Sequence, residues 1–207
     1  MDYTTLERVK WEIKSKLSVT TDDALLAAMI TSASRALDRR CTGVADLSAH
    51  NYFQWEAVSN EKLNGLINSD GEIICYPHKP QIDTVTAFSY RKNIVETEYT
   101  VPVSRVSSEG CKVVAYPQNL PDEYPGKCKV TISYTGGFSG SAAGLPEDLQ
   151  EICALLVIRF YREAESGMSD AIGVAEIGQL VYTKAWPQRV VDQLDTFIRR
   201  QGWRYPG

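Results

Sequence analysis

The chain has 207 residues, enough for one large domain or two small ones whose core needs no disulfide or metal support. Its 43% hydrophobic and 23% charged residues are typical of a globular protein and exclude a disordered or collagen-like chain. A net charge of −4 argues against a protein held to nucleic acid by bulk electrostatics.

The cysteines and the N-terminus indicate a cytoplasmic site of synthesis. The five cysteines are odd in number and form no CxxC pair, which favours a reducing compartment. The first residues lack the basic and apolar regions of an export signal. The longest strongly apolar run, Ile152–Ile158, is far shorter than the roughly 20 residues that span a bilayer. We therefore expect no membrane partner.

Two amphipathic helices are predicted within residues 1–43. Thr4 and Glu7 have the spacing of a capping box, and apolar residues then recur at helical intervals. A second apolar stripe runs from Leu26 to Leu37, and Gly43 follows as a helix stop. The two helices are expected to form a hairpin.

Residues 44–138 have the pattern of a β-rich region. Short runs rich in β-branched and aromatic residues alternate with turn residues, which favours five to seven antiparallel strands with one buried face. The predicted runs are Tyr52–Val58, Glu72–Tyr76, Thr84–Tyr90, Glu98–Val103, Lys112–Tyr116 and Lys129–Tyr134.

Two further helices are predicted after this region. Pro146 suits a helix start, and the residues through Glu165 are apolar on most sides, as in a central core helix. Pro187 begins the last helix. The predicted fold class is α+β, with a four-helix base formed by residues 1–43 and 139–207 and an antiparallel β-subdomain inserted at 44–138.

The connection between the last two helices and the C-terminal tail are the candidate interfaces. A loop of about 20 residues is unusual in a compact domain and is often functional, and Trp, Tyr and Arg dominate binding hot spots. Both segments carry such residues outside the apolar stripes of the helices. The candidate interface residues are Ile172, Val174, Ile177, Leu180, Tyr182, Trp186, Trp203, Arg204 and Tyr205.

Residues that could support catalysis have simpler interpretations. His50 and His78 have no partner at metal-ligand spacing, so no metal site is predicted, and His78 is interpreted as a solvated loop residue. Cys153 lies in the apolar helix, where burial makes a thiol inert. Glu147 and Asp148 suit the positive end of that helix.

Two other patterns also have simpler interpretations. Glu96 and Glu98 could alternate on one strand face as an acid–base pair, but a solvated strand face is the simpler interpretation. The glycines of 136–140 precede a helix without the Gly-Lys-Ser/Thr of a phosphate-binding loop. We predict no catalytic residue, no cofactor and no metal.

Several segments together resemble the head–tail connector (adaptor) family of tailed bacteriophages. The resemblance lies in two separate blocks of sequence, which occur in the same order as in the family and cover about half of the chain. They comprise Tyr3–Lys10, Thr21–Leu26 and Ala33–Asp38, then Tyr134–Phe138, Leu145–Leu149, Arg159–Tyr161 and Pro187–Arg199.

The resemblance implies a structural protein of the virion neck. Members form a ring, commonly of twelve subunits, that docks on the portal protein and connects it to a tail or head-completion protein. DNA passes through the ring without sequence-specific binding. Family members often have a shorter segment between the second and third helices than the 44–138 region of this chain.

Two other functions remain open from the sequence. The β-rich region could be a carbohydrate- or protein-recognition module on a helical base. A hydrolase using Glu96, Glu98 or Glu147 is the third alternative. A ring that forms with portal protein would distinguish the connector from both.

Overall fold

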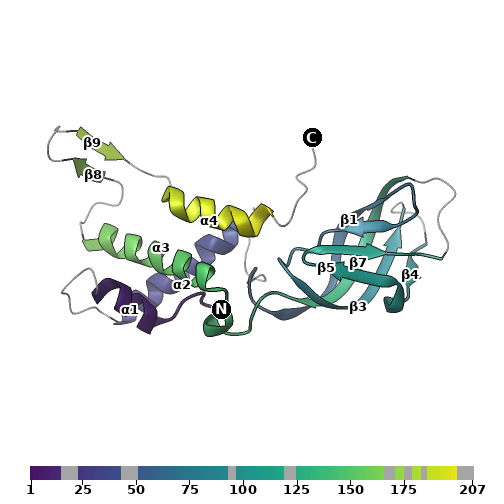
Figure 1. Ribbon diagram of the computed structural model, residues 1–207, viewed down its shortest axis with the longest axis horizontal. Coiled ribbons are helices and arrows are strands. Elements are labelled where there is room, and N and C mark those ends of the chain that lie inside the picture. The colour runs from purple at the N-terminus through teal and green to yellow at the C-terminus, as the bar shows by residue number, and fades with distance from the viewer. Residues whose placement is uncertain are drawn as a thin grey trace. The chain divides into compact units, whose positions relative to one another are not determined.

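The chain folds as an α+β protein with two compact units (Figure 1). The structure is a computed structural model that describes residues 1–14, 23–42, 51–92, 97–118, 125–165, 171–174, 179–182 and 186–199. The first unit groups the described residues of Met1–Asn51 and Ser141–Phe197, and the second is built around Tyr52–Gly140. The predicted α+β class is confirmed, with four helices and a seven-stranded antiparallel sheet in the described residues.

The helical unit contains α1 (Leu6–Lys14), α2 (Asp23–Thr42), α3 (Glu147–Glu165) and α4 (Gln188–Arg199). A short 3-10 turn, η2 (Ala142–Gly144), precedes α3. The predicted capping box at Thr4 is wrong by one residue. Thr5 caps α1 instead, because its Oγ1 accepts the backbone N–H of Arg8 at 3.2 Å, the third residue of the helix. Thr4 is buried.

Helix α3 lies at the centre of the helical unit, as predicted (Figure 1). It packs against both α1 and α2. Its fully or nearly fully buried residues occupy most of its circumference, so they cannot all belong to one stripe. These are Leu149, Ile152, Cys153, Ala154, Leu156, Val157, Ile158 and Tyr161.

The second unit is an antiparallel sheet with the strand order β4-β3-β7-β1-β2-β6-β5. Its strands are β1 (Glu56–Ile67), β2 (Ile73–Cys75), β3 (Ile82–Arg91), β4 (Tyr99–Val101), β5 (Val106–Glu109), β6 (Lys112–Ala115) and β7 (Gly126–Gly136). A 3-10 turn, η1 (Val103–Arg105), links β4 to β5.

The sheet curls around its own apolar face. Strand β5, at one end of the strand order, comes back into contact with β3. The backbone N–H of Ile82 donates to the carbonyl of Gly110 at 2.8 Å, which ties the start of β3 to the β5–β6 turn. The enclosed core includes Phe88, Ile132 and Tyr134. A curled sheet can therefore bury one face without a covering helix.

Three strand predictions need correction. The run predicted at Tyr52–Val58 is a strand that begins at Glu56 and continues to Ile67, because polar residues on its exposed face hide the alternation. Strand β5, with the sequence Val-Ser-Ser-Glu, was not predicted. The connection before α4 is not structureless, since it contains the paired strands β8 (Ala171–Val174) and β9 (Gln179–Tyr182).

Candidate functional site

The predicted interface residues fall into three groups. Ile172 and Val174 belong to β8, whereas Leu180 and Tyr182 belong to β9. In the antiparallel register Ile172 is opposite Val181, so the structure brings the two ends of the predicted loop together as a ribbon. Trp186 lies between β9 and α4 and is half-buried. Ile177, Trp203, Arg204 and Tyr205 lie outside the described residues.

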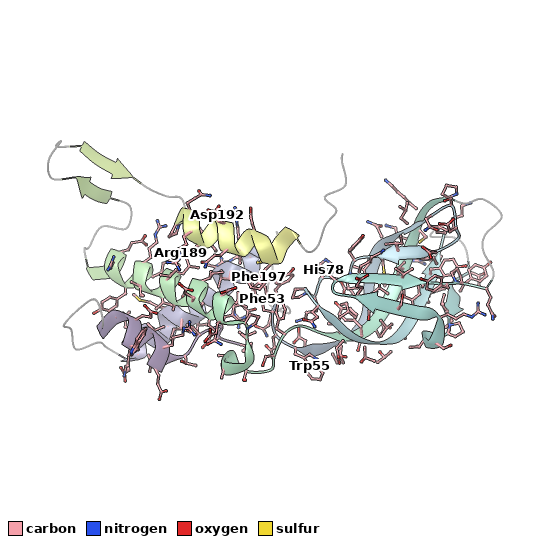
Figure 2. All side chains as sticks on the ribbon, viewed as in Figure 1. Phe53, Trp55, His78, Arg189, Asp192 and Phe197 are labelled. Carbon is pink, nitrogen blue, oxygen red and sulfur yellow. The ribbon has the colours of Figure 1, made fainter. Side chains whose placement is uncertain are left out.

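Helix α4 follows this ribbon and is held by an apolar stripe. Val190, Leu194 and Phe197 are buried, at the helical spacing that the sequence predicts. Arg189, in the first turn of α4 (Figure 2), forms an ion pair of 2.6 Å with Glu151 of α3. The ribbon is therefore connected directly to an anchored helix.

A buried polar network joins three segments of the helical unit. Ser34 of α2 accepts the backbone N–H of Tyr3 at 2.9 Å, and its Oγ lies 3.6 Å from the Cys153 sulfur of α3. The Tyr3 hydroxyl donates to the carboxylate of Asp38, which is fully buried. Arg35 reaches the second oxygen of Asp38 at 3.3 Å. Buried groups satisfied in this way fix one arrangement of the chain.

The sequence pattern indicates this network only weakly. Ser34 and Asp38 interrupt the apolar stripe of α2, but polar residues at such positions are commonly solvated. Only the spacing of four residues between them, which places both on one face of the helix, could have indicated a common partner. Tyr3 precedes the predicted helix and had no assigned role.

Helix α1 and the start of α2 expose apolar residues. The side chain of Trp11 is 68% exposed and that of Leu25 is 41% exposed. Lys10 and Asp23 form an ion pair of 2.5 Å, which places the two helices side by side at this point. Along α2 the exposed positions between Leu25 and Ser32 carry no charge; they are Ala27, Ala28, Thr31 and Ser32. Exposed aromatic and uncharged surface of this kind is typical of contact regions.

The Gly136–Gly137 pair marks a crossing of three backbone segments in the sheet unit. A Cβ on Gly136 would lie 2.6 Å from the carbonyl oxygen of Gln81, and one on Gly137 would lie 2.2 Å from that of Gln54. Gly137 also has a φ of +114°, which favours glycine. The Gly137 N–H donates to Gln81 at 2.8 Å. The glycines thus serve close packing rather than phosphate binding.

His78 is exposed, as predicted, but it has a partner that the sequence did not indicate. Its Nδ1 lies against Glu61, and its backbone N–H donates to Glu61 Oε1 at 3.1 Å. The Tyr134 hydroxyl donates to the other Glu61 oxygen at 2.5 Å. His78, labelled in Figure 2, belongs to the segment between β2 and β3.

A β-bulge brings Glu61 to these partners. The pairing of β1 with β7 shifts between Val58 and Glu61, and Asn60 adopts a φ of 54°, which asparagine tolerates better than most residues. The bulge re-aims the following side chain. The bulge was not predictable from the sequence, because Ser-Asn-Glu at 59–61 has no turn signal strong enough to interrupt a strand.

The pKa values of the cluster follow from this geometry. Burial disfavours the charged Glu61, but hydrogen bonds from His78 and Tyr134 outweigh it and lower the Glu61 pKa. The hydrogen bond and charge of Glu61 raise the pKa of His78. Burial, followed by the charge of Glu61, raises the pKa of Tyr134. The carboxylate of Glu61 thus holds both His78 and the Tyr134 hydroxyl, a structural arrangement that ties the segment before β3 to β1.

Lys79, next to His78, is a buried cation. Its Nζ donates to Glu56 at 2.6 Å and to the Gln54 carbonyl at 2.9 Å, and its side chain is 3% exposed. The carboxylate compensates the buried charge. Lys79 therefore holds the chain segment that leads into β1.

The remaining sequence candidates lie apart from one another. Glu98 is exposed, and a hydrogen bond from Ser89 lowers its pKa, whereas Glu96 and His50 lie outside the described residues. Glu147 and Asp148 are exposed in the first turn of α3, as expected. Burial raises the pKa of Cys153 to about 12, which agrees with its interpretation as a core residue.

Two searches of the described residues give negative results. No group of three or more His, Cys, Asp or Glu side chains there is arranged to hold a metal ion. No helix in that part of the chain combines the length and apolarity needed to cross a bilayer.

Comparison with known proteins gives structural neighbours only. No protein-family model matches the chain, and no curated protein matches it significantly. One solved neighbour is a chain of the neck of an empty gene transfer agent (GTA) particle computed with C6 symmetry, with a TM-score of 0.49, 17% identity and coverage of 94% of this chain and 88% of that one.

Two further neighbours come from native GTA particles. A chain of the virion gives a TM-score of 0.47 at 18% identity, covering 94% of this chain and 89% of that one. A chain of the neck computed with C12 symmetry gives 0.44 at 18% identity, covering 94% and 88%. The solved chains that this protein resembles are thus components of GTA necks and virions.

Proposed function

We propose that the protein is a structural head–tail connector (adaptor) of a tailed phage. In this proposal it acts in the virion neck after synthesis in the host cytoplasm and has no catalytic activity. It forms a ring, of twelve subunits by analogy with the family it resembles. The ring docks on the portal protein, joins it to a tail or head-completion protein, and lets DNA pass.

The observation that carries the proposal is the convergence of the resembling segments. Tyr3 belongs to the first of them and Ser34 and Asp38 to another, and all three residues meet in one buried network. That network continues to Cys153 of α3, between the Leu145–Leu149 and Arg159–Tyr161 segments. Segments that carry the resemblance and lie far apart in the sequence therefore contact one another in the helical unit. This supports a shared architecture rather than a chance match of helix starts.

The glycine crossing supports the same proposal. Tyr134–Phe138 is a further resembling segment, and its two glycines occupy positions that a Cβ would obstruct. The close backbone approach at both positions gives this resembling segment a physical reason for its two glycines. We propose that residues 1–43 and 139–207 are the connector base and that 44–138 is an insertion upon it.

The charge of the chain is compatible with passage of DNA. A wall that neutralised many phosphates would release counterions and bind the duplex tightly. A net charge of −4 is compatible with this requirement, and in this proposal DNA moves through the ring without being held.

Mass measurement of the purified protein with and without portal protein tests the proposal. We expect a ring-sized complex when portal is present, and electron microscopy of that complex would give the subunit number. A chain that stays monomeric and ignores portal would overturn the proposal.

The C-terminal tail supplies a more specific test of portal contact. We propose that Trp186, Trp203, Arg204 and Tyr205 contact portal or a neighbouring subunit. Truncation after Arg200 should weaken portal binding at least tenfold. The full-length double variant Trp203→Ala, Tyr205→Ala removes the aromatic side chains without shortening the chain. It therefore distinguishes the effect of the side chains from the effect of truncation. Portal binding undiminished in both variants would remove the tail from the interface.

A second candidate function is recognition by the sheet unit. Trp55, Tyr99 and Tyr116 are each exposed by more than two-fifths, and Trp and Tyr are enriched in binding surfaces. A monomer that binds a glycan or a protein other than portal, and that loses binding in Trp55→Ala, would favour this candidate. Unchanged portal assembly in Trp55→Ala would favour the connector.

A further inference from the structure

The β8–β9 ribbon has two outer edges without a strand beside them in the described part of the chain. The sheet that contains β8 and β9 consists of these two strands, paired from Ala171↔Tyr182 to Val174↔Gln179. An isolated two-stranded hairpin is only marginally stable in water. Its outer N–H and C=O groups are ready to pair with another strand.

The composition of the ribbon also indicates burial. Apart from Gly173 and Gln179, every residue of the two strands is apolar, and none is charged. Successive residues of a strand belong to opposite faces, so a ribbon with this sequence is apolar on both faces. Natural edge strands that stay exposed usually carry charges or proline to prevent association. This ribbon has neither.

We propose that β9 of one subunit pairs with β8 of the next, so that the ribbons join into a continuous antiparallel sheet around the ring. The proposal rests on the ring assembly proposed above and names the contact between neighbouring copies. The occupant of each edge is a second copy of this chain.

The direction of the strands favours a second copy. The two edges of a hairpin run in opposite directions, so ribbons placed side by side in the same orientation meet as antiparallel neighbours at every junction. Subunits related by rotation about a ring axis have this arrangement. The contact is head-to-tail, and contacts of this type close into rings. The absence of charge on either edge removes like-charge repulsion between copies.

Disulfide trapping between single-cysteine variants tests the pairing. One preparation carries Ile172→Cys on β8, and three others carry Leu180→Cys, Val181→Cys or Tyr182→Cys on β9, which samples the possible registers. Each β9 variant is mixed with the β8 variant, assembled with portal and oxidised. The five native cysteines are buried, so the added thiol is the accessible one.

The expected result is a disulfide between chains in at least one of the three mixtures and in neither partner alone. Directly paired strands place Cα atoms about 4.5–5.5 Å apart, within the range of a disulfide. Equivalent positions on consecutive ribbons are two strand spacings apart, about 9.5 Å, which is too far. A strong Ile172→Cys dimer without any β9 partner would overturn the proposal in favour of a two-fold contact.

A charged substitution on β9 tests whether ring assembly depends on pairing between ribbons. Val181→Lys places a charge on the ribbon and should reduce the fraction of subunits in the ring at least tenfold, while the helical circular dichroism is unchanged. Gln179→Ser, which changes the polar position of β9, is the matched control and should assemble like the parent chain.

The outcomes distinguish this inference from the proposed function. A parent chain that forms portal-bound rings, without trapped disulfides and without loss in Val181→Lys, overturns the edge pairing alone. A parent chain that forms no ring with portal overturns both.

Discussion

The helical unit and the sheet unit are stabilised in different ways. The helical unit surrounds one apolar helix, α3, and its buried polar groups join segments distant in sequence, as Tyr3 does with Asp38. The sheet unit encloses its own core by curling, and its polar contacts gather around β1, where Glu61 meets Tyr134 and Glu56 meets Lys79. The first arrangement leaves uncharged residues of α2 exposed, whereas the second encloses a core of buried residues within the curled sheet.

The two units bury their cores differently, but both keep exposed apolar side chains. A sheet that closes on its own core needs no partner for stability. The helical unit exposes Trp11 and Leu25 and carries the β8–β9 ribbon. The sheet unit also exposes large hydrophobic side chains, those of Trp55, Leu66, Tyr99, Val103 and Tyr116. The following predictions test how each unit is stabilised, in order of expected effect.

The largest effect is expected at the glycine crossing of the sheet unit. Gly137→Ala introduces a Cβ against the Gln54 backbone at a φ of +114°, so unfolding free energy should fall by at least about 3 kcal/mol. Gly140→Ala is the matched control, because a Cβ there meets nothing within 4 Å. Urea denaturation of both variants measures the difference. Equal stability would show that the crossing is not constrained as described.

The next effect is expected in the network of the helical unit. Asp38→Ala removes the acceptor of the Tyr3 hydroxyl and the partner of Arg35, so it should destabilise the unit by about 3 kcal/mol. Tyr3→Phe should cost about 1 kcal/mol. A double-mutant cycle should show coupling of at least 0.5 kcal/mol, in the range of about 0.5–3 kcal/mol for residues in contact. Additive effects would mean that the two residues act independently.

A smaller, pH-dependent effect is expected in the sheet unit. The lowered pKa of Glu61 gives stability that is present above its ordinary value of 4.5 and is lost as the pH falls through the folded value. The raised pKa of His78 gives stability that is present below 6.5 and is lost as the pH rises through the folded value. The stabilisation from the pair is therefore largest between about pH 4.5 and 6.5.

His78→Gln tests this profile. Because the His78 side chain is 60% exposed, its loss should reduce stability by less than about 1 kcal/mol at pH 5.5. The difference from the parent chain should shrink as the pH rises through the raised pKa of folded His78, and measurements at pH 5.5 and 8.5 compare the two sides of the profile. A difference that does not change between these pH values would contradict the ion pair.

The smallest effect is expected at the surface of the helical unit. Arg189 and Glu151 form a close ion pair, but their side chains are 65% and 32% exposed. Solvent screening limits such pairs, so Arg189→Ala should change stability by less than about 0.5 kcal/mol. Val190→Ala, at the neighbouring buried position, should cost about 2 kcal/mol. Similar losses in the two thermal unfolding curves would contradict an apolar attachment of α4.

The fold was predictable where the hydrophobic period was long and clear. The apolar circumference of α3 predicted a buried helix. The alternation of Val130, Ile132 and Tyr134 predicted strand β7 and its buried face. Strand β5 was not predictable, because four mostly polar residues at one end of a sheet lack a buried alternating face. The cap at Thr5 instead of Thr4 shows that neighbouring threonines cannot be distinguished by spacing alone.

The polar contacts were not predictable, because they depend on register and on distant partners. Glu61 meets His78 only because a bulge at Asn60 re-aims it. Asp38 has a buried partner only because Tyr3 returns to α2 across 35 positions of sequence. The β8 and β9 residues were identified as a candidate interface from their apolar character, but their pairing required the structure.

Native mass measurement of the chain mixed with portal protein tests the central claim most directly. The connector proposal predicts a portal-dependent ring that is absent when the chain is measured alone, with a mass of portal plus a whole number of subunits near twelve. A chain that remains monomeric in the presence of portal would contradict the proposal.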